Sequence, residues 1–314
     1  KRMRKLALSD EILMKVDKAA RYIGGEVNSV MKDKNAVDIR FAMCFPDVYE
    51  IGMSNLGMMI LYNMFNQRED VWCERLFSPW PDLDKVMREE KIPLFALESQ
   101  EPIRDFDFLG ITIGYEMCYT NILQVLDLSG IPLKSADRGE DFPIVIGGGA
   151  CAYNPEPLAP FFDMFYIGEG ETVYDALFDA YKANKKAGGS RKDFLLAAAK
   201  IPGIYVPSLY EVTYKEDGTI ASFAPTADGV PEKVQKQLII DMEKEYRAVE
   251  APVVPHIKAT QDRVTLEIQR GCIRGCRFCQ AGMIYRPTRE RDVETLKESA
   301  RIMLKNTGHE EISL

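Results

Sequence analysis

Short apolar segments alternate with segments of helical periodicity from residue 36 to residue 183, and this alternation limits the possible folds of the chain. The strand-like segments are residues 37–44, 72–77, 94–97, 108–113, 143–146 and 164–167. The helix-like segments are residues 56–66, 83–90, 121–129 and 172–183. Nearly continuous apolar strands separated by helices are typical of a parallel sheet that is covered on both faces. The sequence therefore predicts an α/β domain over residues 36–200.

The loops that follow these strands are rich in glycine and polar residues. They comprise residues 45–55, 114–120, 147–155 and 168–171. In a parallel sheet all of these loops lie at the carboxyl edge, where ligands of doubly wound folds bind. We therefore expect a ligand site at this edge.

The segments on either side of the sheet have a different texture. Residues 9–21 have helical spacing with Ser9 or Asp10 as the cap, and the turn-rich residues 22–28 are interpreted as a plain connector. The charged residues 182–192 are expected to be exposed. Residues 201–258 are expected to form a linker with a hairpin, because strand-like residues 210–214 and 219–223 flank a turn at 215–218.

A third unit begins near residue 259. It offers a strand at 265–270, a helix at 293–305 and the opening of a strand at 311–314. This is the order of one β/α repeat followed by the start of the next. Since the sequence ends inside an apparent strand, we expect the chain to be a fragment of a longer protein.

Three of the seven cysteines lie together in Cys272-Ile-Arg-Gly-Cys276-Arg-Phe-Cys279, directly after the predicted strand 265–270. Iron–sulfur clusters are held by cysteine thiolates, normally four of them, so three would leave one iron open to another molecule. Structural zinc takes four ligands, and no fourth Cys or His lies near this motif. The other four cysteines, Cys44, Cys73, Cys118 and Cys151, are scattered and are expected to be buried thiols in a reduced, cytoplasmic chain.

Composition excludes several functional classes. A net charge of −8 gives no support to general nucleic-acid binding, and no apolar run approaches the length that spans a membrane. Arginines surround the cysteine motif at positions 263, 270, 274, 277, 286, 289 and 291. We interpret most of them as ion-pair partners of Glu267, Glu290, Asp292 and Glu294 and as stabilisers of an anionic group at the cysteines. The alternatives are docking of an acidic electron donor and recognition of a phosphate-bearing substrate.

The cysteine motif, with Phe278 before its last thiol, resembles the cluster motif of radical S-adenosylmethionine (radical SAM) enzymes. The resemblance implies that Cys272, Cys276 and Cys279 hold a [4Fe-4S] cluster, and that S-adenosylmethionine binds its fourth iron and is cleaved reductively. It also implies a reducing partner such as flavodoxin or ferredoxin. Residues 259–314 would be the truncated start of the family's (β/α) barrel, which carries further contacts outside this sequence.

The preceding domain resembles the Rossmann-like, flavodoxin-like domain that binds cobalamin in many radical SAM proteins. Gly147-Gly148-Gly149 before Asn154-Pro-Glu, and Tyr166-Ile-Gly168-Glu169-Gly170-Glu171 before a helix, carry this resemblance. It implies four domain segments, at residues 1–35, 36–200, 201–258 and 259–314. It also implies cofactor contacts by Asp47, Tyr49, Gly52, Tyr115, Gly147, Gly148, Gly149, Gly168, Glu169, Gly170 and Phe278.

One position departs from the family pattern. The family's cobalt-ligating loop reads Asp-x-His-x-x-Gly, whereas this chain has Asp47-Val-Tyr49-Glu-Ile-Gly52. A neutral phenol is a poor cobalt ligand, so we expect cobalamin without a histidine ligand, with Tyr49 packed near its lower face. The alternative is a domain that has lost cobalamin and keeps only the fold.

The two resemblances together imply an enzyme that modifies an unreactive carbon by radical chemistry, with methyl transfer as the default reaction. The alternative is a non-catalytic iron–sulfur or cobalamin carrier, or a regulatory binding module. The sequence identifies neither the substrate nor a catalytic residue.

Overall fold

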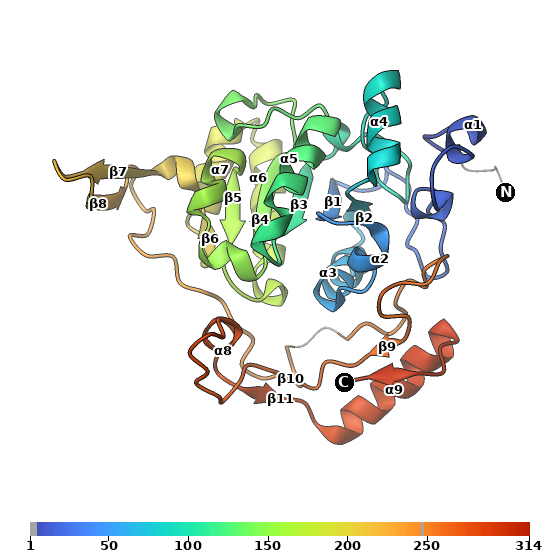
Figure 1. Ribbon diagram of the computed structural model, residues 1–314. Coiled ribbons are helices and arrows are strands. Elements are labelled where there is room, and N and C mark those ends of the chain that lie inside the picture. Colours follow the sequence, from blue (N-terminus) through green and yellow to red (C-terminus); the bar gives the residue numbers. More distant parts are fainter. Residues whose placement is uncertain (1–4, 246–247) are drawn as a thin grey trace.

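A six-stranded sheet forms the centre of the computed structural model, which describes residues 5–245 and 248–314 (Figure 1). Residues 1–4 of the predicted N-terminal segment lie outside the described residues. The strands are β1 (Ile39–Phe45), β2 (Val71–Phe77), β3 (Phe108–Thr112), β4 (Ile144–Gly148), β5 (Met164–Tyr166) and β6 (Ile204–Tyr205). Their order is β2-β1-β3-β4-β5-β6, parallel except for β6. The first five follow the flavodoxin-like order, in which ligands bind beside the switch between β1 and β3.

Helices cover both faces of this sheet, as the alternating pattern predicts. The helices α3 (Leu56–Gln67), α6 (Tyr174–Lys186) and α7 (Arg191–Ala198) pack on one face, and α4 (Pro81–Glu90) and α5 (Tyr119–Leu128) pack on the other. All seven residues of β1 are buried, with Phe41 and Met43 facing α3 and Ala42 and Cys44 facing α5. Burial on both faces explains why the strands are apolar without alternation.

Shorter elements join these parts. They are α1 (Asp10–Leu13), α2 (Tyr49–Gly52) and the 3-10 turns η1 (Ala19–Arg21), η2 (Ile103–Asp105), η3 (Glu116–Cys118), η4 (Ser135–Asp137), η5 (Ala150–Tyr153), η6 (Glu156–Phe161), η7 (Gly170–Thr172) and η8 (Pro207–Leu209). Residues 9–21 do not form one helix: Ser9 caps α1 as expected, but Lys18 adopts a left-handed backbone with φ of 52°.

Residues 94–97 are not a strand of the sheet. Phe95 forms only an isolated antiparallel bridge with Pro102, and the N–H groups of Leu94 and Leu97 bond singly to the carbonyls of Leu128 and Arg75, so the segment does not pair with a strand of the sheet. The helix α7 begins inside the segment expected to be merely charged and exposed, with Ser190 and Asp193 forming a capping box. The antiparallel strand β6 extends the sheet into residues that were expected to form a linker.

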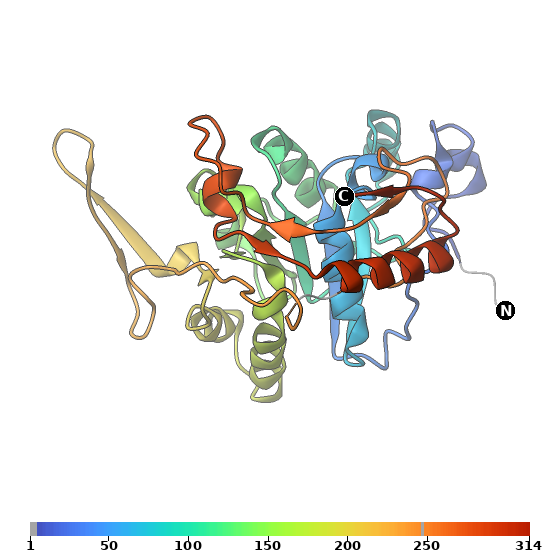
Figure 2. The ribbon, with the colours of Figure 1, turned by 90° about the horizontal axis from the view of Figure 1, so that it is seen from below.

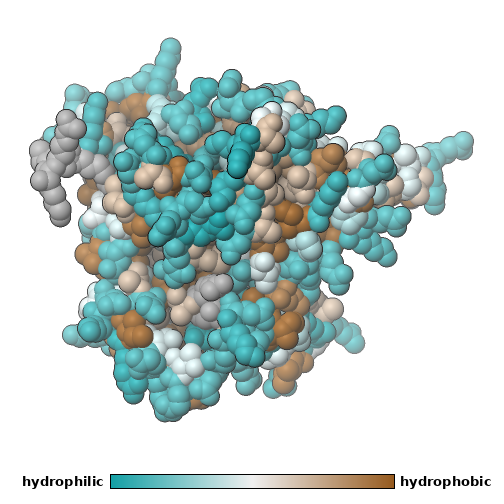
Figure 3. Space-filling view, turned by 180° about the vertical axis from the view of Figure 1, so that it is seen from behind, coloured by the Kyte–Doolittle hydropathy of each residue, from teal (hydrophilic) through white to brown (hydrophobic). Residues whose placement is uncertain are grey.

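The predicted hairpin is confirmed. Strands β7 (Tyr210–Tyr214) and β8 (Ile220–Pro225) pair antiparallel and project away from the body of the molecule (Figures 1 and 2). Charged and polar side chains dominate the face seen from behind, with apolar residues in separate patches (Figure 3). Within the described part of the chain, no helix combines the length and apolar character needed to cross a membrane.

The C-terminal unit lies against the lower edge of the sheet domain in Figure 1 and crosses it in Figure 2. It contains β9 (Val264–Thr265), β10 (Gln269–Arg270), α8 (Ala281–Ile284), β11 (Arg289–Glu290), α9 (Val293–Thr307) and β12 (Ile312–Ser313). The predicted strand at 265–270 is split, because β9 pairs parallel with β12 whereas β10 pairs antiparallel with β11. The predicted β/α repeat is present as β9, α9 and β12.

Candidate functional site

A cavity of about 530 Å³ lies between the carboxyl edge of the sheet and the C-terminal unit. Its upper wall comes from the ends of β3 and β4, the loop after β5, and apolar side chains of α3 such as Ile60 and Leu61. Its lower wall comes from Glu267, Arg270 and Tyr285 of the C-terminal unit. This volume lies within the range of roughly 300–1,000 Å³ that is typical of small-molecule sites.

Glycines form the upper rim of this cavity. Gly148, Gly149, Gly168 and Gly170, which belong to the two glycine motifs, all line it. Gly149 has φ of 103° and Gly168 has φ of 140°, and a Cβ at Gly168 would lie 2.3 Å from the Gln237 oxygen. These two positions therefore require glycine. Gly147 is not among the lining residues, since its Cα faces the rings of Phe162 and Phe165.

The loop after β1 is placed differently from the expectation. Tyr49 is only 1% exposed, does not line the cavity, and donates its hydroxyl to Glu26 at 2.9 Å. Burial and the Glu26 charge raise the pKa of Tyr49 well above its usual value. Gly52 lies against the Phe77 ring, where a Cβ would approach to 2.2 Å. The position of Tyr49 thus gives no support to a contact with a ligand in this cavity.

Asp47 and Tyr115 contact each other rather than the cavity. The Tyr115 hydroxyl donates to Asp47, and this hydrogen bond, with burial, raises the pKa of Tyr115 to about 12. Both residues remain at the carboxyl edge, and Tyr115 is exposed. Their predicted role as cofactor contacts stays a prediction.

Glu169 lines the cavity, but its carboxylate is held by arginines of the C-terminal unit. Arg289 donates to both carboxylate oxygens, at 2.8 and 2.7 Å, and Arg270 lies 3.2 Å away. Glu171 accepts a hydrogen bond from Arg270 at 2.6 Å, and so does Glu267 at 2.9 Å. Of these ion pairs, only the one between Arg270 and Glu267 was expected from the sequence.

The charge state of Arg270 follows from these partners. Burial alone would lower its pKa, but the hydrogen bonds to Glu267 and Glu171 raise the pKa above its usual value. Arg270 therefore stays a cation at the cavity wall. The contact between the glycine loop and the stem of the cysteine loop had one sequence signal. The glycine loop carries two acidic residues, and two arginines flank the cysteine motif.

The three clustered cysteines lie in the loop between β10 and β11. Cys276 is exposed, Cys272 and Cys279 are half-buried, and Phe278 is 92% exposed. All three thiols are free, which suits thiolate ligation of an iron–sulfur cluster. In the described residues no three His, Cys, Asp or Glu side chains are already arranged around a metal position. The scattered cysteines Cys44, Cys73, Cys118 and Cys151 are buried, as predicted.

This loop also contacts the other glycine motif, because α8 packs against η5, which follows Gly149. Three segments that are far apart in the sequence therefore meet around one cavity: the Gly147–Gly149 motif, the Gly168–Glu171 loop and the cysteine loop.

Residues 57–207 match the family described as "Radical SAM proteins, N-terminal". The matched segment runs from α3 to η8, so it contains most of the sheet domain and ends before the cysteine motif. A curated relative, "Uncharacterized protein MJ0966" of Methanocaldococcus jannaschii, is 26% identical over 256 residues, which are 81% of this chain and 44% of the relative.

Two similar solved structures are of TsrM from Kitasatospora setae, described as a radical S-adenosylmethionine methyltransferase. The structure with tryptophan substrate and a SAM analog has a TM-score of 0.44 and 15% identity, covering 87% of this chain and 46% of TsrM. The structure with cobalamin and a [4Fe-4S] cluster has a TM-score of 0.43 and 13% identity, covering 84% and 45%. The chain thus spans less than half the length of each of these relatives.

Proposed function

We propose that this chain supplies the corrinoid-binding domain and the cluster-binding loop of a radical SAM enzyme. The observation that carries the proposal is the shared cavity, whose upper rim is the glycine edge of a flavodoxin-like sheet and whose lower wall leads directly into Cys272. The match of residues 57–207 to an N-terminal family of radical SAM proteins supports the same assignment.

Cys272, Cys276 and Cys279 would hold three irons of a [4Fe-4S] cluster and leave the fourth for S-adenosylmethionine. The cluster would supply the electron for reductive cleavage of the sulfonium, and the corrinoid a transferable methyl group. The glycine rim allows the backbone to approach a large ligand closely, and the protein positions these groups and excludes water.

A corrinoid in this cavity would receive no histidine from the described residues. The His256 ring lies 3.2 Å from the Gly24 carbonyl, and His309 lines a different pocket. Because the Tyr49 hydroxyl donates to Glu26, we propose that the cobalt would receive neither a histidine nor a tyrosine ligand from the protein.

The exposed cysteine loop also supports docking of a small acidic reductant, such as flavodoxin or ferredoxin. Arg274, Arg277, Ile273 and Phe278 are all exposed around the thiols. A basic surface with apolar side chains suits a transient, electrostatically steered contact. Free thiols and an oxygen-sensitive cluster fit a reducing compartment such as the cytoplasm.

The test uses the full-length protein that contains this chain, reconstituted anaerobically with iron and sulfide. We expect about four irons per chain, a corrinoid absorption spectrum, and 5′-deoxyadenosine formed from S-adenosylmethionine. Cys276→Ala should abolish the cleavage, whereas Cys73→Ala, which removes a buried thiol of β2, should retain it.

The outcomes separate the alternatives. Cleavage that persists in Cys276→Ala would reject the cluster assignment. Cofactor binding without any cleavage would instead identify a carrier or regulatory module, and iron uptake without a corrinoid spectrum would reject cobalamin retention in the sheet domain.

A further inference from the structure

The base of the cysteine loop is a two-stranded ladder with two like charges at its centre. Strands β10 and β11 contribute two residues each, and Arg270 lies directly opposite Arg289. Directly opposed like charges destabilise an antiparallel pair, and a ladder this short has little stability of its own. The stem that holds the three thiols therefore requires a counter-charge from elsewhere.

Glu171 and Glu267 pair with Arg270, whereas Glu169 of the sheet domain supplies a counter-charge to both arginines. Its carboxylate is buried, is 2.7 Å from Arg289 and 3.2 Å from Arg270, and accepts the Ile239 N–H at 3.0 Å. Arg289 in turn donates to the Ile239 carbonyl at 2.6 Å. One side chain thus joins the sheet domain, the linker and both strands of the stem.

We propose that Glu169 is a positioning residue that closes the stem of the cysteine loop and sets the thiols over the cavity. Its neighbours Gly168 and Gly170 form part of the cavity rim, so the same short loop shapes the ligand site and clamps the stem. The consequence for cluster placement rests on the proposed function, whereas closure of the stem does not.

The first experiment measures hydrogen exchange in the full-length protein without iron. Exchange in peptides covering residues 266–271 and 282–291 should be on the order of tenfold faster or more in Glu169→Gln, because a buried ion-pair partner is lost. Glu267→Gln is the matched control: it also removes a carboxylate from Arg270, yet it leaves Arg289 paired, so the same peptides should change little. Hydrogen exchange in peptides of β1 and β3 should be the same as in the wild type for both variants, which would show that the sheet is intact.

The double variant Glu169→Gln/Arg289→Gln tests the like-charge argument itself. Removing one arginine relieves the repulsion that Glu169→Gln exposes, so exchange in the stem should be slower than in the single variant. A double variant that is equally open or more open would overturn the proposal, as would a Glu169→Gln stem that exchanges like the wild type.

The second readout uses reconstituted protein. Glu169→Gln should still bind iron, because the thiols are intact, but its KM for S-adenosylmethionine should rise several-fold and the electron paramagnetic resonance signal of the reduced cluster should respond less to S-adenosylmethionine. Unchanged values for both would overturn the positioning role. A wild type that binds no iron would reject the proposed function and leave the stem to be decided by hydrogen exchange alone.

Discussion

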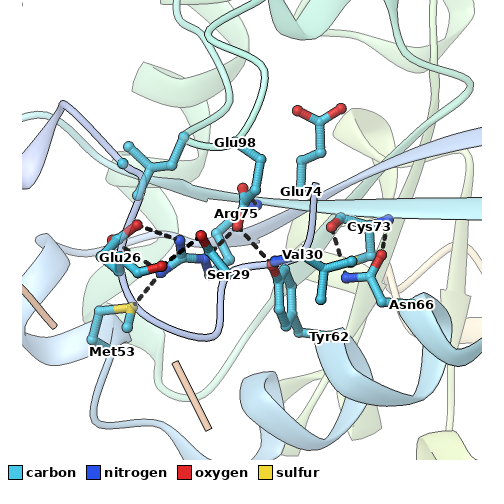
Figure 4. Close-up of polar contacts among 12 residues, drawn as sticks. Glu26, Ser29, Val30, Met53, Tyr62, Asn66, Cys73, Glu74, Arg75 and Glu98 are labelled. Carbon is cyan, nitrogen blue, oxygen red and sulfur yellow. Dashed lines mark hydrogen bonds and ion pairs between the residues drawn. The ribbon is translucent and has the colours of Figure 1, made fainter. Parts of the chain in front are cut away.

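Arg75→Met should be among the most damaging single substitutions in the sheet domain. Arg75 is fully buried in β2 and bonds two buried carboxylates, Glu26 at 2.7 Å and Glu98 at 2.6 Å (Figure 4). Removing one partner of a buried ion pair costs about 3–5 kcal/mol, out of about 5–15 kcal/mol for a whole domain. For a domain of this size the loss corresponds to a fall in Tm of roughly 10 °C.

The loss should depend on pH, with a sign that follows from the carboxylates. Burial would raise the pKa of Glu26, but attraction and hydrogen bonds from Arg75 lower it below its usual value. In Arg75→Met burial acts without that attraction, so Glu26 protonates more readily and the penalty shrinks as pH falls. We therefore expect a larger Tm difference from the wild type at pH 8 than at pH 5.

The assay is thermal unfolding followed by circular dichroism at both pH values. The matched control is Arg68→Met, whose three partners Asp70, Asp175 and Asp179 are partly or largely exposed. That variant should lose no more than about 1 kcal/mol. A loss of similar size in the two variants, or an Arg75→Met loss that is the same at pH 5 and pH 8, would refute the reasoning.

Three further predictions concern separate parts of the chain. Burial raises the pKa of Glu50, but hydrogen bonds from Arg21 and Lys18 lower the pKa to about 2. The stability that ionised Glu50 adds to the fold is therefore present above pH 4.5 and is lost as the pH falls toward 2. In Glu50→Gln the midpoint of urea unfolding should fall less steeply than in the wild type over this pH range. Gly168→Ala should cost about 1–3 kcal/mol in chemical denaturation, because of its φ of 140° and its contact with Gln237. Gly148→Ala should leave stability nearly unchanged, since its Cβ would meet no atom within 4 Å, but should weaken corrinoid uptake by narrowing the cavity.

Five strands of the sheet could be predicted from the sequence because burial on both faces leaves a local signal in each of β1 to β5. The segment at 94–97 has the same apolar composition, but its residues 94–96 fill the core beside α5 and Leu97 packs in the core on the other face of the sheet. Composition does not distinguish a strand from such core-filling residues. Strand β6 contributes only two residues, which is too short for a periodic pattern. Helix α7 was not predicted, because the charged residues of its first turn are also typical of a solvated loop.

The candidate site was predictable where glycine is required and unpredictable where charges pair over long distances. Gly149 and Gly168 follow strand ends, so their positions at the carboxyl edge could be read locally. Glu26 sits in a segment interpreted as a plain connector, yet it is 3% exposed and bonds Arg75, which is 49 residues away. Glu169 and Arg289 are separated by 120 residues. No local pattern pairs such residues, because the fold alone brings them together.

The two buried charge networks have a common physical consequence. Desolvation offsets much of the attraction within a buried ion pair, so such pairs add little net stability, but any arrangement that leaves one partner buried and unpaired is strongly disfavoured. Glu26 and Arg75 apply this penalty to the segment 22–28, which they join to β2, and Glu169 and Arg289 apply it to the stem of the cysteine loop. An apolar contact at either place would tolerate sliding, whereas paired charges permit one register. We infer that the first pair specifies where the segment 22–28 lies on the sheet and that the second specifies where the stem of the cysteine loop lies at the cavity.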